Sequence, residues 1–174
     1  MTTKDSDRRP TRGPGTLATL VATIGGNVYI LFGTIVCASV AILVSWIPPR
    51  GDWTFQVARI WSRGLLAFSG VRVAVENETS LDPERPSVYM SNHQSLYDIP
   101  ALIVSLPGQT RFLAKRSLFR IPIFGWSIKA GGFISIDRED RSKAQESFSA
   151  AVQRLQAGNS ALVFPEGTRS EDGS

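Results

Sequence analysis

The sequence has little of what builds disulfides or metal sites. Among its 174 residues there is one cysteine, Cys37, and one histidine, His93. A lone cysteine excludes an internal disulfide and any cluster built on several cysteines, and a single histidine leaves too few ligands for a zinc site of the usual kind. We therefore expect no metal and no bound cofactor. Histidine is the side chain that ordinarily exchanges its proton near neutral pH, so His93 is the first candidate for proton transfer.

The sequence also lacks a large excess of charge of either sign. It has 19 Lys and Arg residues against 15 Asp and Glu residues, a formal net charge of +4. That surplus is too small to indicate a nucleic-acid-binding protein, but it suits an anionic membrane surface or a phosphorylated substrate. Apolar residues make up 43% of the chain, which is typical of a folded domain with its own core.

No charged residue occurs between Arg12 and Arg50. Gly25-Gly26 and Pro48-Pro49 bracket the part of this window that we expect to be helical, Asn27 to Ile47. A helix of that length rises about 31 Å, close to the roughly 30 Å of a bilayer's hydrocarbon core. Its Asn, Ser and Thr residues make it less apolar than a strong single-pass anchor. A full span and a half-buried hairpin both remain open.

The charge pattern around this window also predicts how the chain is divided. We expect residues 1–15 to be a disordered basic tail, residues 16–70 to be membrane-associated helices, and residues 71–174 to be a globular domain. Basic residues that flank an apolar segment favour the cytoplasmic side of a membrane. We therefore expect a protein of the cell membrane with its globular domain on the cytoplasmic side. The basic residues before the window are Lys4, Arg8, Arg9 and Arg12.

The segment from Asp52 is predicted to be a second helix. Asp52 can cap its N-terminus, and Arg59 and Arg63 lie about one turn apart on it. Basic residues and two tryptophans beside an apolar face are typical of a helix that lies in the headgroup layer of a membrane. An ordinary amphipathic helix packed on the globular domain remains the alternative. The apolar positions with helical spacing are Trp53, Val57, Ile60, Trp61, Leu65 and Phe68.

From residue 71 onward, short apolar runs alternate with helical patterns. This predicts an α/β domain with a central sheet flanked by helices. The clearest helix runs through Ala144 and Leu155 and ends at Gly158, and a shorter one covers Ile99–Leu106. The chain stops nine residues after Pro165 with no further strand, so we also expect the sequence to be incomplete at its C-terminus. The predicted strands are Val71–Val75, Ser87–Met90, Arg111–Ala114, Phe133–Ile136 and Ala161–Phe164.

A histidine and a carboxylate stand five residues apart in the polar turn before the predicted helix over 99–106. A hydroxyl group is a poor nucleophile until a base takes its proton, and a positioned histidine does this for a rate gain of roughly 10²–10⁴. A carboxylate beside the ring fixes its tautomer and stabilises the imidazolium that forms. Positions five apart differ by about 140° around a helix. His93 and Asp98 can therefore meet only if His93 lies in the turn and Asp98 in the first helical turn.

The same turn also matches a helix-capping pattern. Ser95 and Asp98 are three residues apart before an apolar run, with Pro100 in the first turn. The capping and the catalytic interpretations are compatible, because a helix N-terminus can hold the pair in place. Ser95 is also an alternative nucleophile, although it lacks any base other than His93.

A second polar motif, Phe164-Pro-Glu-Gly-Thr-Arg-Ser170, directly follows a predicted strand. Loops at strand ends are where α/β proteins commonly bind ligands. Arg169 offers a planar, permanently charged guanidinium whose paired N–H donors match phosphate oxygens. Gly167 has no side chain and so lets the backbone come close to a ligand. The alternative is a solvated loop with an exposed arginine. The basic residues between the two motifs, among them Lys115 and Arg138, are by themselves typical of a solvated surface.

Three motifs in this order resemble the lysophospholipid acyltransferase family. They are His93-x-x-x-x-Asp98, Gly132-Phe-Ile-Ser-Ile-Asp-Arg138 and Phe164-Pro-Glu-Gly-Thr-Arg-Ser170. The resemblance covers about residues 71 to 170 and extends to the N-terminal helices, and within the family it is greatest to the bacterial 1-acylglycerol-3-phosphate acyltransferases. The fourth motif of that family, a later apolar stretch with a proline, is missing from this sequence.

The resemblance implies that residues 71–174 are an acyltransferase catalytic domain, incomplete at its end. Such an enzyme transfers a fatty acyl group from acyl-CoA or an acyl-carrier protein to the free hydroxyl of lysophosphatidic acid, a membrane lipid, without a cofactor. His93 would be the base and Asp98 its partner. Acylation of another lyso-lipid such as lyso-ornithine lipid, and a non-catalytic module that binds lipid phosphate, remain alternatives. The residues implied to bind the acceptor's phosphate are Lys115, Arg138, Glu166, Gly167, Thr168 and Arg169.

Overall fold

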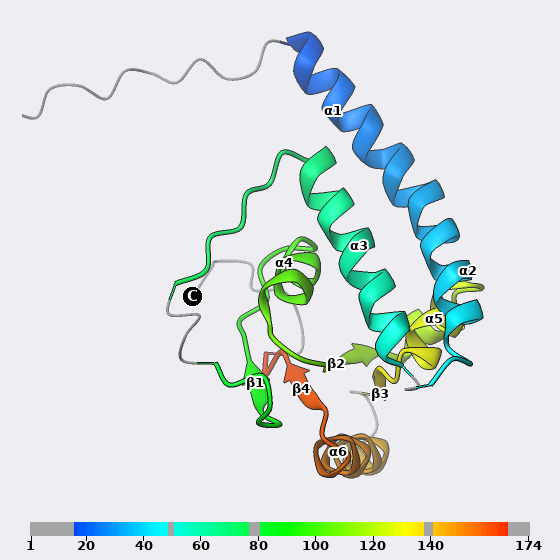
Figure 1. Cartoon of the computed structure of the whole chain (residues 1–174), viewed down its shortest axis with the longest axis vertical. Coiled ribbons are helices and arrows are strands. Elements are labelled where there is room, and N and C mark those ends of the chain that lie inside the picture. Colours follow the sequence, from blue (N-terminus) through cyan, green and yellow to red (C-terminus); the bar gives the residue numbers. More distant parts are fainter. Residues whose placement is uncertain (1–15, 49–50, 77–80, 138–140, 167–174) are drawn as a thin grey trace, which may run out of the picture.

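The computed structural model describes residues 16–48, 51–76, 81–137 and 141–166. Two long helical segments form an antiparallel hairpin beside a globular part (Figure 1). The first runs without a break from α1 (Thr16–Val28) through a π-helical turn (Tyr29–Gly33) into α2 (Thr34–Val44). The second, α3 (Asp52–Phe68), returns beside α2. The predicted disordered tail lies outside the described residues.

The predicted start of the first helix at Asn27 is wrong. The helix begins at Thr16, and Gly25-Gly26 lie within it. A glycine inside a helix costs only about 1 kcal/mol, so a favourable contact can compensate for it. Both glycines lie beside the end of α3: a Cβ on Gly25 would be 3.9 Å from the Phe68 ring, and one on Gly26 would be 3.7 Å from the Ser69 hydroxyl.

Hydrogen bonds made by side chains also join the two arms of the hairpin. The Tyr29 hydroxyl donates to the carbonyl of Trp61 over 3.1 Å, and the Trp61 indole N–H donates to the Thr34 hydroxyl over 3.0 Å. Gly64 makes room for this contact, because a Cβ there would overlap the Tyr29 hydroxyl. The arms are therefore held in register by polar groups within an otherwise apolar contact.

The N-terminus of α3 differs in detail from the prediction. The helix does begin at Asp52, but the N-cap is Gly51, whose φ of +90° suits glycine, and no side-chain cap bond is present there. The Asp52 carboxylate instead lies 3.4 Å from the Nη2 atom of Arg111 on the sheet. The first turn of α3 is thus attached to the globular part by an ion pair rather than capped by its own aspartate.

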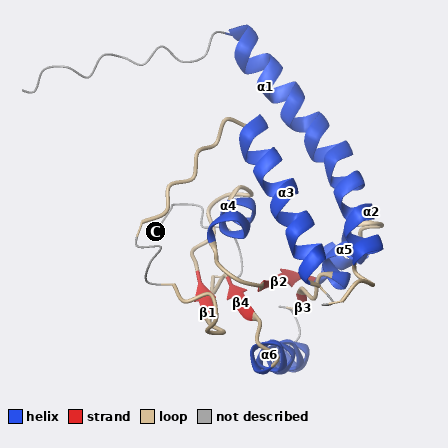
Figure 2. Ribbon diagram, viewed as in Figure 1, coloured by secondary structure: helices blue, strands red, loops and turns tan. Residues whose placement is uncertain are grey.

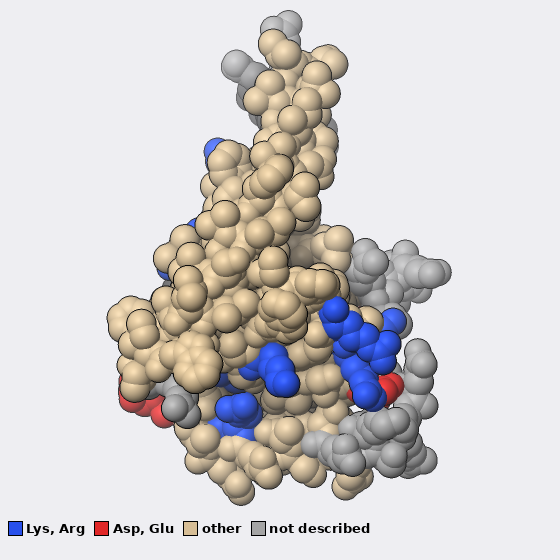
Figure 3. Space-filling view, turned by 90° about the vertical axis from the view of Figure 1, so that its right-hand side faces the viewer, with Lys and Arg blue, Asp and Glu red and all other residues tan. Residues whose placement is uncertain are grey.

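The outward face of the hairpin is apolar and exposed. Figure 3 shows this face largely without charged side chains along its upper part, with Lys and Arg gathered lower down over the globular part. On α3, Phe55 and Leu66 are buried, whereas Trp53, Ile60 and Phe68 are 50–61% exposed. The helix therefore has two apolar faces. One packs on the domain, as the amphipathic-helix interpretation predicted, and the other points outward.

The globular part is an α/β fold, as predicted. Four strands form one parallel sheet in the order β1-β4-β2-β3. Helices α3 and α4 (Asp98–Ser105) cover one face, and α6 (Arg141–Gln156) covers the other (Figure 2). A 3₁₀ turn (Arg116–Arg120) and α5 (Phe124–Ala130) join β2 to β3. The strands are β1 (Val88–Met90), β2 (Thr110–Lys115), β3 (Ile134–Ile136) and β4 (Ser160–Val163).

Alternate residues of the two central strands enter two separate cores. Phe112 and Leu162 pack on the side of α3 and α4, whereas Leu113 and Ala161 pack on the side of α6. This alternation follows from the two-residue period of a strand, and burial of both faces is the rule for parallel sheets. The four strands predicted at residues 87–164 are confirmed within about two residues at each end.

The predicted strand at Val71–Val75 is wrong. Residues 71–75 have no sheet partner in the described part of the chain, and Val71, Val73 and Val75 are each more than a third exposed. Alternation predicts a strand only where a sheet edge is available to pair with it. The predicted end of α6 is confirmed: Gly158 has a φ of +85°, and its N–H donates to Leu155 while that of Asn159 donates to Arg154.

Candidate active site

The candidate residues converge on one edge of the sheet because all four strands are parallel. β1 leads into His93, β4 leads into Phe164 and Glu166, and β2 ends at Lys115. β4 lies between β1 and β2, with Met90 opposite Val163. Segments that are far apart in sequence therefore leave the sheet side by side at its carboxyl edge, where α/β proteins commonly bind ligands.

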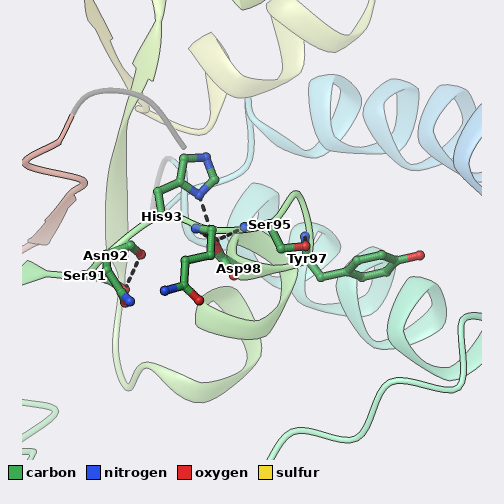
Figure 4. A network of polar contacts seen from close by, with 7 residues as sticks. Ser91, Asn92, His93, Ser95, Tyr97 and Asp98 are labelled. Carbon is green, nitrogen blue, oxygen red and sulfur yellow. Dashed lines mark hydrogen bonds and ion pairs between the residues drawn. The ribbon is translucent and has the colours of Figure 1, made fainter. Parts of the chain in front are cut away.

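His93 and Asp98 are in direct contact (Figure 4). The Nδ1 atom of His93 lies 2.9 Å from the Oδ2 atom of Asp98. Asp98 is the first residue of α4, and His93 lies in the turn before it, which is the arrangement that the five-residue spacing required. The side chains are 14% and 25% exposed, so the pair is partly shielded from solvent yet accessible.

The Asp98 carboxylate is held by further donors in the same turn. Its Oδ2 atom accepts hydrogen bonds of 2.7 Å from the N–H groups of Gln94 and Ser95. Burial raises the pKa of this carboxyl, but the hydrogen bonds from Ser95, His93 and Gln94 outweigh burial, and the pKa lies below its ordinary value. An ionised Asp98 accepts from Nδ1–H of a neutral imidazole, which leaves the lone pair on Nε2.

The predicted capping box is only half formed, and Asp98 also makes the contact with His93 that the catalytic interpretation requires. Asp98 accepts from the Ser95 N–H, which is half of a capping box, and the same oxygen accepts from His93. The other half is absent, since the Asp98 N–H donates to the Ser95 carbonyl over 3.3 Å. The Ser95 hydroxyl accepts from the Tyr97 N–H over 3.2 Å, and within the described residues it makes no hydrogen bond to His93.

Phe164 contacts the imidazole from a different element. The rings of His93 and Phe164 are stacked, with centroids 4.3 Å apart and planes inclined by 22°. Phe164 directly follows β4 and is only 7% exposed. Sequence reasoning placed Phe164 at the end of a strand but missed this contact, because nothing local to either residue indicates that β1 and β4 are neighbours.

The sequence placed Arg59 on a basic helix face but did not predict its contacts within the protein. Arg59 reaches from α3 to the C-terminal end of α4, where Nη2 donates to the carbonyls of Leu106 over 2.7 Å and Gly108 over 3.1 Å, and Nε donates to Ile103 over 3.3 Å. The last carbonyls of a helix have no partner within it, so the guanidinium satisfies groups that would otherwise be unpaired.

A second link joins the turn itself to α3. The Tyr97 hydroxyl donates to the Ser69 hydroxyl over 2.8 Å, and Tyr97 points away from the His93 ring (Figure 4). Together with Arg59, this contact ties both ends of α4 to the helix that also forms the hairpin. The dyad is thus supported from the hairpin side as well as from the sheet.

The remaining predicted residues are only partly described. Lys115 and Glu166 are exposed at the carboxyl edge of the sheet. Asp137, which precedes Arg138, accepts a 3.0 Å hydrogen bond from Arg116. The others, Arg138, Gly167, Thr168 and Arg169, lie outside the described residues. In the described part of the chain, no three His, Cys, Asp or Glu side chains gather as metal ligands.

Comparison with known proteins settles the family. A family model described as Acyltransferase matches residues 72–174, more than half of the chain. This chain belongs to the acyltransferase family. The match begins where the globular part begins, and the family expected from the three motifs is confirmed.

Individual acyltransferases resemble the chain over most of its length. The chloroplastic 1-acyl-sn-glycerol-3-phosphate acyltransferase LPAT1 of Arabidopsis thaliana is 36% identical over 128 residues, which is 72% of this chain and 35% of the plant protein. The human 1-acyl-sn-glycerol-3-phosphate acyltransferase alpha is 33% identical over 149 residues, 85% of this chain and 51% of the human protein. The chain therefore spans about a third to a half of the length of these relatives.

A solved structure extends the likeness to the fold. The crystal structure of the 1-acyl-sn-glycerophosphate (LPA) acyltransferase PlsC from Thermotoga maritima matches with a TM-score of 0.68 and 26% sequence identity. The match covers 91% of this chain and 63% of the PlsC chain. Because residues 71–174 make up less than two thirds of this chain, a match over 91% includes helical residues that precede the globular part.

Proposed function

We propose that this acyltransferase transfers a fatty acyl group from an acyl thioester to the free hydroxyl of lysophosphatidic acid, forming phosphatidic acid. The observation that carries the proposal is the 2.9 Å contact between His93 and Asp98 at the carboxyl edge of the sheet. The relatives described above support it, since their names give 1-acyl-sn-glycerol-3-phosphate acyltransferases. Acyl-CoA or an acylated carrier protein supplies the thioester.

In the proposed reaction, His93 acts as a general base. Its Nε2 atom takes the proton of the acceptor hydroxyl as that oxygen attacks the thioester carbonyl carbon. The tetrahedral intermediate then collapses, the carbon–sulfur bond breaks, and the leaving thiolate takes the proton from the imidazolium. Asp98 holds the tautomer with Nε2 unprotonated and stabilises the imidazolium between the two proton transfers. No covalent acyl-enzyme is required.

We assign the acceptor's phosphate to the loop that follows β4. Glu166 leads into Gly167, Thr168 and Arg169, and Lys115 ends the neighbouring strand β2 at the same edge. Arg138, beyond the end of β3, completes the proposed set. A permanently charged guanidinium and a lysine are side chains that suit a phosphate dianion, which a lyso-lipid without phosphate does not carry.

We further propose that the hairpin holds the protein on the cytoplasmic side of the cell membrane. One helix, Thr19–Val44, is long and apolar enough to cross a bilayer, and its outward side chains are exposed (Figure 3). However, α2 packs along its length against α3 and α5. Only its outer side is therefore free for lipid, so we favour the half-buried hairpin over a full span. This location would present the dyad to an acceptor that resides in the membrane.

The proposal is tested by measuring acyl transfer by the full chain to lysophosphatidic acid and to lyso-ornithine lipid, with acyl-CoA and acyl-carrier protein as donors. We expect turnover with lysophosphatidic acid and little with the phosphate-free acceptor. Preference for lyso-ornithine lipid would favour that alternative. Lipid binding without turnover by any donor would favour a non-catalytic module.

Ser95→Ala serves as the control that separates the two mechanisms. If His93 activates the acceptor directly, this variant keeps most of its turnover, because among the described residues the Ser95 hydroxyl is bonded to the Tyr97 N–H and not to His93. If Ser95 is instead acylated, its loss abolishes turnover, and the wild-type protein releases free thiol from the donor in a burst before any acceptor is added.

A further inference from the structure

The His93 ring is held by two contacts of different kinds. The contact with Asp98 fixes one nitrogen at 2.9 Å, but a single hydrogen bond leaves the ring free to turn about the line that joins the two atoms. The stack against Phe164, at 4.3 Å and 22°, removes that freedom because it fixes the ring plane. The two contacts come from α4 and from the end of β4, which are separate elements.

Phe164 is itself firmly held. It is 7% exposed and belongs to the core cluster that includes Phe112, Leu162 and Ile103. Its ring therefore cannot move without disturbing the packing between the sheet and α4. The stack attaches the imidazole to the core of the domain, whereas the Asp98 contact attaches it to the turn.

We propose that Phe164 is a positioning residue that sets the direction of the His93 Nε2 lone pair and shields one face of the ring. The proposal rests on the proposed function, in which Nε2 takes the acceptor's proton. Proton transfer depends on the donor and acceptor being aligned as the transition state is reached, so a ring that turns loses rate rather than substrate affinity. The aromatic face also favours the imidazolium that forms during the reaction.

The test compares Phe164→Leu with the wild-type chain in three measurements: kcat, the KM values for both substrates, and the proton NMR signals of the imidazole. His93 is the only histidine in the chain, so its ring signals are unambiguous in protein without a histidine tag. We expect kcat to fall about tenfold, because loss of the energy of a stacked aromatic pair corresponds to a rate change of about that size. Both KM values should stay within about twofold of the wild type. The imidazole signals should move downfield, because the ring current of Phe164 is lost.

Phe112→Leu is the matched control. Phe112 belongs to the same core cluster, but its ring stacks on Phe133 rather than on His93. We expect this variant to lose similar stability while kcat and the imidazole signals stay near those of the wild type. Phe164→Tyr keeps a ring that can stack on His93, so its kcat should stay near that of the wild type. If Phe164→Leu does not fold, Phe164→Met fills more of the same volume without a ring and replaces it.

Several outcomes would overturn the proposal. Imidazole signals that do not move in Phe164→Leu would mean that the rings are not stacked in solution. If the imidazole signals move in Phe164→Leu but kcat is unchanged, the stack does not position the base. If Phe112→Leu loses as much kcat as Phe164→Leu, Phe164 contributes only to the packing of the core. Failure of the proposed function is separate: the wild-type chain would then not acylate lysophosphatidic acid, or His93→Ala would keep the wild-type turnover, whatever the signals of His93 do in the Phe164 variants.

Discussion

The hairpin and the sheet domain treat large apolar side chains in opposite ways. On the hairpin, Leu31 and Phe32 are 58% and 61% exposed, whereas Phe112 and Leu162 in the sheet are 3% and 0% exposed. Water would penalise the first arrangement, since soluble proteins rarely expose a continuous apolar face. The sheet buries its own core, whereas the exposed apolar face of the hairpin is what the proposed attachment to a membrane requires.

Helix α3 belongs to both regions and couples them. Its buried side contributes Phe55 to the core of the sheet domain, while Ile60 on the other side is 61% exposed. Arg59 and Ser69 connect the same helix to the two ends of α4. A change on the outward side is therefore expected to alter membrane binding, and a change on the inward side to alter folding or catalysis.

The largest effect is expected from the reaction centre. His93→Ala should lower kcat by roughly 10²–10⁴ or more, because only the transition state uses the base. Binding to lipid vesicles should be unchanged, since the hairpin is intact. Acyl-transfer rates and vesicle sedimentation of the same preparation measure both quantities, and near-normal turnover would refute the assignment of the base.

A smaller loss is expected at the acceptor's phosphate. Arg169→Lys should raise the KM for lysophosphatidic acid and lower kcat/KM by about one to two decades, because lysine cannot reproduce a bidentate contact worth roughly 1.5–3 kcal/mol. The KM for the thioester donor should change much less. If both substrates suffer alike, Arg169 does not select the phosphate.

Loss of the contact between the regions should appear as lost stability. Arg59→Met leaves the carbonyls at the end of α4 without their donor and should lower the free energy of unfolding by about 2 kcal/mol. Arg63→Met is the control one turn away, because Arg63 is exposed, and it should change stability by less than about 0.5 kcal/mol. Denaturant titration of both variants measures this, and equal losses would mean that the Arg59 contacts carry no stability.

The smallest change is expected from trimming one exposed side chain in each region. Val36→Ala on α2 should weaken binding to vesicles by up to about tenfold, since each buried methyl group is worth about 0.8 kcal/mol. Val152→Ala on α6 makes the same change on the far face of the sheet. Both residues are exposed, at 61% and 50%. Vesicle binding that responds equally to both variants would mean that the hairpin is not the lipid-facing surface.

Local patterns predicted the elements of the sheet domain well. The strand at Ala161–Phe164 and the helix that ends at Gly158 follow from apolar spacing and from the preference of glycine for positive φ, which are properties of the segment alone. The pairing of His93 with Asp98 could also be predicted. Two side chains five residues apart can meet here only if the first lies in the turn and the second in the first turn of the helix. Each of these conclusions needed only the neighbouring residues.

Contacts between distant segments could not be predicted. The stack of Phe164 on His93 depends on the strand order, and the contacts of Arg59 depend on where α4 ends relative to α3. Periodicity also cannot reveal whether a partner exists, so Val71–Val75 was assigned to a strand that has no sheet edge to join. The local sequence also could not show that the helix continues through Gly25-Gly26, which lie beside the end of α3.

We infer that Asp98 holds His93 as the base in the proposed acyl transfer to lysophosphatidic acid. The most direct test is the rate of phosphatidic acid formation by Asp98→Asn and by the wild-type chain, each measured over a range of acceptor concentrations up to saturation with the donor saturating. The amide preserves the shape of the side chain but not the charge that favours the reactive tautomer and the imidazolium. We expect kcat to fall by about 10² or more with the KM for lysophosphatidic acid nearly unchanged. A kcat near that of the wild type would contradict the account.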